Sequence, residues 1–135
     1  ATPHRDIADP CSTEYPLRLT PGRALAQYQC GTQTRRVESL QSIAAQPVAE
    51  LHPATAGRLG VGDGERVRLT TRRGEGTFRV KVTRTIREDT VFVPFHWGGE
   101  HCINRLTIGA LDPVSRMPEF KICAVRVEKA HEVRA

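Results

Sequence analysis

The chain has 135 residues and a mass of 15.0 kDa, which suits one compact domain and is too little for two of ordinary size. Hydrophobic residues make up 39% and charged residues 26%, a globular composition, and no apolar run is long enough to form a membrane-spanning helix. The 20 basic and 15 acidic residues give a net charge of +5, which favours an anionic partner, but only 5% of the residues are aromatic, which argues against stacking the bases of single-stranded nucleic acid.

Alternating apolar and polar residues predict a series of short strands. In chain order we expect a strand over 15–20 and a chain reversal at Pro21–Arg23, then strands over 48–51, 66–70, 78–82, 91–95 and 121–128. Pro53 and Gly60 delimit a small helix, and 103–111 has room for a helical turn or two. Five or six strands, one or two short helices and long loops over 21–46 and 96–120 predict a mainly β protein, a small closed barrel.

The four cysteines are Cys11, Cys30, Cys102 and Cys123, which are far apart and form no CxxC pair. A chain of this length can build a core without disulfides, so we expect free thiols and a cytoplasmic protein. His101 and Cys102 are adjacent, but two further ligands are missing, and we predict no metal ligands.

Two clusters of polar residues lie in the long loops. The first joins Pro21–Arg23 to Gly31–Arg36, and its glycines, hydroxyls and arginines are suited to a diphosphate, with a plain solvated loop as the alternative. The second begins at His96–Gly99 and includes Asn104, Asp112 and Lys121. There Trp97 would form a flat pocket wall while Asn104 and Lys121 bind a heterocycle and an anion; the alternative is a core tryptophan at a barrel-end turn.

No catalytic set is present in the sequence. It contains no GxSxG, HExxH, Walker or GxGxxG motif, and its carboxylates are mostly isolated. The residues by themselves therefore offer no candidate catalytic site.

Five stretches in order carry a family resemblance: YPLRLTPGR, GTQTRRV, HPATAGRLGVGDGERVRLTTRRG, VFVPFHWGG and ALDPVSRMPEFKICAVRVE. They resemble the C-terminal molybdopterin-dinucleotide-binding domain of bacterial molybdenum oxidoreductases of the assimilatory nitrate reductase and formate dehydrogenase type. The resemblance runs over 15–129, and it implies a six-stranded double-psi β-barrel whose loops face bis-molybdopterin guanine dinucleotide.

The resemblance also implies a set of cofactor-binding residues. These are Gly22, Arg23, Leu25, Tyr28, Gln29, Cys30, Thr32, Thr34, Arg35, His96, Asn104 and Lys121. Asn104 and Lys121 match an Asn and a Lys that contact the pterin dinucleotide in relatives, and His96 matches a residue near the pterin and the substrate funnel. The chain departs from the family pattern at Pro21, Gln33 and Tyr28-Gln29.

The resemblance implies the C-terminal domain of a longer enzyme, with 1–14 as a linker or tail, 15–129 as the barrel and 130–135 as a C-terminal tail. Nitrate reduction is slightly favoured over formate oxidation. The molybdenum ligand, the iron–sulfur cluster and the catalytic residues would belong to the remaining domains, its expected partners, so the resemblance implies that this chain alone catalyses nothing. We expect no nucleic acid and no membrane as partner. The alternative is a stand-alone barrel that binds a cofactor, a protein or a nucleic acid.

Overall fold

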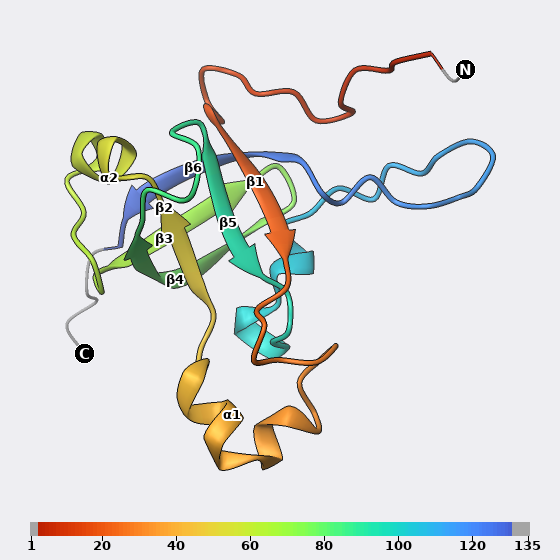
Figure 1. Ribbon diagram of the computed structural model, residues 1–135. Coiled ribbons are helices and arrows are strands. Elements are labelled where there is room, and N and C mark those ends of the chain that lie inside the picture. Colours follow the sequence, from red (N-terminus) through yellow and green to blue (C-terminus); the bar gives the residue numbers. More distant parts are fainter. Residues whose placement is uncertain (1–2, 131–135) are drawn as a thin grey trace.

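The computed structural model describes residues 3–130, and its centre is a closed barrel of six strands (Figure 1). The strands are β1 (Leu17–Gly22), β2 (Val48–Leu51), β3 (Arg66–Thr71), β4 (Gly74–Val82), β5 (Thr90–Pro94) and β6 (Cys123–Lys129). Two short α-helices, α1 (Glu38–Ile43) and α2 (Pro53–Leu59), and three 3-10 turns, η1 (Thr34–Arg36), η2 (Gly99–His101) and η3 (Ile103–Arg105), complete the fold. The closed six-stranded barrel of the double-psi type that we expected is confirmed.

The strands form because every second residue is apolar and can leave water inside the barrel. Leu19, Leu69 and Val91 are fully buried, and they belong to a core to which all six strands contribute. Closure also pairs the strand edges, which would otherwise expose unpaired backbone groups. Among the described residues no helix has the length and apolar character to cross a membrane.

The strand order around the barrel is β1-β5-β2-β4-β3-β6. β1 runs parallel to β5, with Gly22 opposite Pro94, and β2 runs parallel to β4. β6 runs antiparallel to β1, with Leu19 opposite Cys123. The chain therefore leaves β1 and β5, and enters β6, at one edge of the barrel (Figure 1).

The residues that begin and end the helix predicted α2 correctly. Pro53 stands at its start, where a missing N–H costs nothing, and the ring of His52 accepts a hydrogen bond from Ala54 N at 3.2 Å. Gly60 ends the helix with φ of 65°.

The predicted chain reversal at Pro21–Arg23 is wrong, because β1 continues through Pro21 and Gly22 along β5. Proline fits there because β6 pairs with β1 only over Leu17–Leu19, so β1 has a single neighbour beside Pro21. Glycine fits because a Cβ on Gly22 would lie 2.3 Å from Cε2 of Phe92.

The loop predicted over 21–46 contains η1 and α1. α1 buries none of its residues, so it has no apolar stripe for periodicity to detect.

An ion pair joins β1, near its start, to the residue that precedes β5. Arg18 donates to the carboxylate of Asp89 at 2.8 Å, and its backbone N–H donates to Asp89 O at 2.9 Å. Hydrogen bonds from Arg87 above all, and from Thr90, lower the pKa of the Asp89 carboxyl from 3.8 to about 2, although partial burial opposes the shift. Asp89 is therefore ionised in the folded protein at pH values where an unfolded aspartate is protonated.

This depressed pKa predicts how stability depends on pH. Asp89 contributes stability above its ordinary pKa of 3.8 and loses that contribution as the pH falls toward 2. In urea unfolding at a series of pH values, the free energy of unfolding of Asp89→Asn should fall less steeply than that of the wild type over this window. Asp6→Asn, at a fully exposed position, should keep the wild-type slope. Equal slopes for Asp89→Asn and the wild type would contradict the role given to the Asp89 carboxylate.

Candidate functional site

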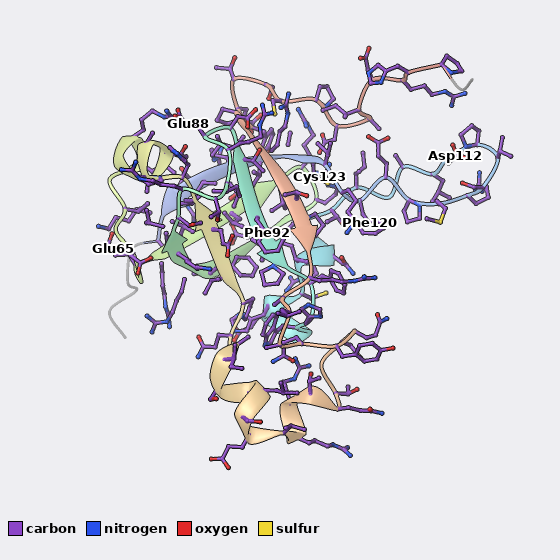
Figure 2. The ribbon with its side chains drawn as sticks, in the orientation of Figure 1. Glu65, Glu88, Phe92, Asp112, Phe120 and Cys123 are labelled. Atoms are coloured by element: carbon purple, nitrogen blue, oxygen red, sulfur yellow. The ribbon has the colours of Figure 1, made fainter. Side chains whose placement is uncertain are left out.

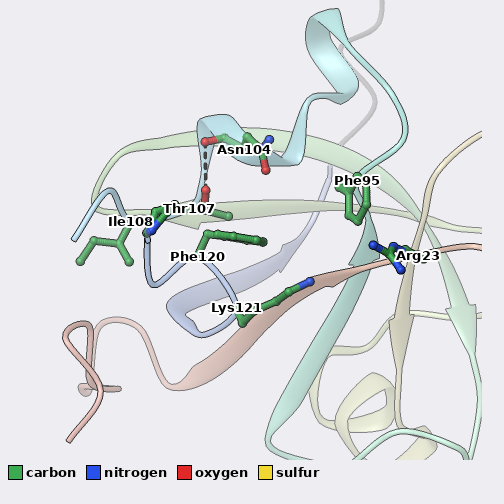
Figure 3. A pocket seen from close by; sticks show the side chains of 8 residues that line it. Arg23, Phe95, Asn104, Thr107, Ile108, Phe120 and Lys121 are labelled. Atoms are coloured by element: carbon green, nitrogen blue, oxygen red, sulfur yellow. Dashed lines mark hydrogen bonds between the residues drawn. The ribbon is translucent and has the colours of Figure 1, made fainter. Parts of the chain in front are cut away.

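A cavity of about 780 Å³ opens at the edge where β1 and β5 end and β6 begins (Figure 3). Its lining comes from four segments: the end of β1, the end of β5, η3 with the residues after it, and the approach to β6. The lining residues are Arg23, Phe95, Asn104, Thr107, Ile108, Pro118, Phe120 and Lys121. This volume is typical of a small-molecule or cofactor site.

The lining is basic and partly aromatic. The eight described residues include two cations, Arg23 and Lys121, and no carboxylate. The ammonium of Lys121 donates to Pro21 O at 3.3 Å and lies 4.9 Å from the ring centroid of Phe120 and 5.8 Å from that of Phe95. The pocket therefore presents a held positive charge beside apolar rings, which suits an anion joined to a flat heterocycle.

The aromatic wall comes from residues that we did not predict. Trp97 does not line this cavity; it is 8% exposed and packs edge-on against His96, with ring centroids 5.8 Å apart, as the core alternative stated. Phe95 and Phe120 take the role expected of Trp97. The position of Phe120 directly before Lys121 was the available signal, since adjacent residues at a strand entrance reach the same edge.

His96 ties the loop after β1 to the end of β5. Its ring is 1% exposed, its Nε2 accepts from Ala24 N at 2.8 Å, and its Nδ1 lies 2.5 Å from Gln29 O. Because Nε2 faces an N–H donor, the proton belongs on Nδ1, which donates to the carbonyl. Both ring nitrogens are thus used to hold the two ends of 24–29.

Arg35 secures the second half of the same loop. Its guanidinium donates to Cys30 O and, at 3.1 Å, to His96 O, and it lies 6.0 Å from the ring centroid of Trp97. Gly31 makes room for it, since its φ is 72° and a Cβ there would lie 2.3 Å from Nη1 of Arg35. The side chain predicted to bind phosphate is thus engaged with the backbone in this structure.

The other loop residues predicted to bind the cofactor lie outside the cavity lining. Leu25 is 105% exposed and Tyr28 is 68% exposed, and both face solvent with Cys30 and Thr32. The Thr32 hydroxyl, its Oγ1 3.7 Å from Sγ of Cys30, lowers the pKa of that thiol, together with the backbone N–H of Thr32. Their contact with a cofactor stays a prediction.

Two other predicted positions, one on the loop and one at the end of β1, contact neighbouring side chains of the protein. Thr34 donates from its hydroxyl to the side chain of Gln27 at 2.7 Å, and Gly22 ends β1 against Phe92. The structure thus brings Arg23, Asn104 and Lys121 together in one cavity. The remaining predicted residues lie outside its lining, at the end of β1, on the loop that follows it and, for His96, after β5.

Asp112, which we grouped with Asn104 and Lys121, does not belong to the cavity. It lies far out on the arm 110–120, whereas Phe120 lies where the arm joins the barrel (Figure 2). Its carboxylate accepts from the N–H groups of Val114 at 3.0 Å and Ser115 at 2.7 Å, so it shapes the turn of the arm.

These observations define a β-barrel with a basic, aromatic-walled cavity at one edge. The sequence model of the Molydopterin dinucleotide binding domain matches residues 17–124, which is most of the chain. The chain belongs to this family.

Curated relatives of two kinds align with the chain. It is 40% identical over 127 residues to the F420-dependent formate dehydrogenase 1 subunit alpha of Methanococcus maripaludis, covering 92% of this chain and 19% of that protein. It is 42% identical over 116 residues to the assimilatory nitrate reductase catalytic subunit of Bacillus subtilis, covering 86% of this chain and 16% of that protein. The chain therefore spans less than a fifth of the length of these relatives.

A solved structure shares the fold. Acetylene hydratase from Pelobacter acetylenicus superimposes with a TM-score of 0.74 at 25% sequence identity, covering 87% of this chain and 19% of that chain.

Replacing His96 by phenylalanine tests whether the ring holds the loop. The variant keeps a flat ring and loses both hydrogen bonds, so the amide of Ala24 should exchange with deuterium faster, and the free energy of unfolding should fall by about 1–2 kcal/mol. His101→Phe changes a half-buried histidine elsewhere and serves as the control. Wild-type exchange at Ala24 in His96→Phe would show that the ring does not hold the loop.

Proposed function

We propose that this chain binds one guanine dinucleotide arm of bis-molybdopterin guanine dinucleotide as a domain of a molybdenum oxidoreductase. The observation that carries the proposal is the convergence of Arg23, Asn104 and Lys121 on one cavity walled by Phe95 and Phe120. Their chemistry fits such a ligand, which has a charged diphosphate, a heterocycle with an amide edge and flat apolar faces.

Each residue has a distinct task in this proposal. Arg23 presents a planar fork that can pair with two phosphate oxygens, and Lys121 supplies a second, fixed positive charge. Asn104 offers both a donor and an acceptor to a heterocycle. Phe95 and Phe120 exclude water and strengthen the electrostatic contacts beside them.

The loop 22–36 and His96 contribute placement in the same proposal. The bonds from His96 and Arg35 hold the loop against the end of β5, so that its exposed outer face, with Leu25, Tyr28 and Thr32, covers the cofactor. The bound molybdenum cofactor would supply the two-electron chemistry.

The proposal also includes the longer enzyme to which this domain would belong. The molybdenum ligand and an iron–sulfur cluster would belong to other domains of a longer cytoplasmic enzyme, because the chain covers only 19% and 16% of the length of these two relatives. Relatives named as nitrate reductase and as formate dehydrogenase support nitrate and formate about equally. Of the two, we propose nitrate as the substrate of the longer enzyme. Assays of the intact enzyme with nitrate and reduced viologen, and with formate and oxidised viologen, separate the two.

GDP serves as a probe for the nucleoside diphosphate part of the site, and calorimetric titration measures its affinity. Lys121→Met should weaken binding about tenfold, because a hydrogen bond to a charged group is lost. Lys81→Met removes a lysine that pairs with Glu50 on the barrel surface and should leave the affinity unchanged. Equal affinities for Lys121→Met and the wild type would contradict the assignment of this cavity.

A further inference from the structure

Asp9 is a buried carboxylate in the segment before β1, outside the part of the chain that matches the family. It is 3% exposed, although its neighbours in sequence are mostly exposed. Its carboxylate accepts from Arg72, from Arg73 at 2.5 Å and from the backbone N–H of Ala124 at 3.0 Å. The segment expected to be a linker is therefore bound to β6 and to the turn between β3 and β4.

The environment of Asp9 keeps it ionised. Burial opposes the charge, but the hydrogen bonds from Arg73 and Ala124 and the charges of Arg73 and Arg72 outweigh it and lower the pKa of the carboxyl. Loss of the carboxylate would leave two guanidinium groups facing each other with no anion between them. A buried ion pair of this kind adds little net stability, so stability alone does not explain why Asp9 is buried. Its effect on the orientation of the two arginines is the second role to consider.

Two hydrogen bonds connect this segment to the walls of the cavity. Arg73, held by Asp9, donates through Nε to Leu106 O at 3.2 Å. Leu106 is 1% exposed and lies between Asn104 and Thr107, both of which line the cavity. On the other wall, the N–H of Ala8 donates to Glu119 at 2.9 Å, between Pro118 and Phe120.

A third connection closes the network. The N–H of Ile108, a lining residue, donates to Sγ of Cys123 at 3.2 Å, and the next residue, Ala124, donates to Asp9. Asp9 is thus linked to the wall 104–108 through Arg73 and Ala124, and to the other wall through its neighbour Ala8.

We propose that Asp9 is a positioning residue for the cavity: it orients Arg73, which holds the Asn104–Ile108 wall at the distance from Lys121 that the bound nucleotide needs. That the ligand is a nucleotide rests on the proposed function, whereas the effect of Asp9 on the position of the wall does not. Asp9 acts through Arg73 and touches no ligand itself.

The first test compares two isosteric replacements in one segment of the full 135-residue chain. Asp9→Asn removes the buried charge, and Asp6→Asn makes the same change at a fully exposed position three residues earlier. Asp9→Asn should bind GDP about fivefold more weakly, a typical effect of a change along a coupling network, and Asp6→Asn should bind as the wild type does. Unchanged affinity in a folded Asp9→Asn overturns the proposal.

The second test separates positioning from general stability. Arg72→Lys and Arg73→Lys each remove a guanidinium from Asp9, but only Arg73 also reaches Leu106. Arg73→Lys should weaken GDP binding, and Arg72→Lys should not, even where their melting temperatures fall alike. Equal losses of affinity would assign Asp9 a structural role only.

A readout without ligand keeps the two proposals apart. In Asp9→Asn and Arg73→Lys the amide of Ile108 should exchange with deuterium faster than in the wild type, at temperatures well below melting. If the wild-type chain binds no GDP, the proposed function fails and this exchange alone decides the role of Asp9. Wild-type exchange in both variants overturns the role.

Discussion

The parallel pairing of β1 with β5 is the constraint on which the site depends. Because Gly22 lies opposite Pro94, the two strands end together and release Arg23 and Phe95 at the same edge. β6 runs antiparallel to β1 and therefore enters the barrel at that edge, which brings Lys121 within 3.3 Å of Pro21 O. A shift of this register by one residue would turn these side chains to the other face of the sheet.

The net positive charge of the chain is distributed unevenly. On the barrel surface most cations pair with carboxylates, as Arg18 does with Asp89, Lys81 with Glu50 and Lys129 with Glu65. In the cavity, Lys121 is held by a carbonyl and two aromatic rings instead, and its charge stays available for an anion. A fixed cation recognises an anion at a lower entropic cost than a mobile one, because the side chain is ordered before the ligand arrives.

The sequence predicted the barrel because alternation of apolar residues is a local property, and β2 and α2 have the predicted bounds. Prediction failed where the outcome depends on distant partners. Pro21 stays in a strand because β6 does not pair with β1 as far as that residue. Asp9 is buried because it pairs with Arg73, which lies 64 residues further along the chain. Of the site, the family resemblance supplied Arg23, Asn104 and Lys121, whereas the aromatic wall was found only in the structure, where the strand ends come together.

The central claim is that a nucleoside diphosphate binds at the edge where β1 and β5 end and β6 begins. Nuclear magnetic resonance spectra of the ¹⁵N-labelled chain, recorded during titration with GDP, test it most directly because every backbone amide except those of the prolines reports its own environment. The account predicts the largest shifts at Arg23, Asn104 and Lys121, and unchanged signals from α2, whose Arg58 lies outside this cavity. Shifts concentrated on α2, or no shifts at the cavity, would contradict it.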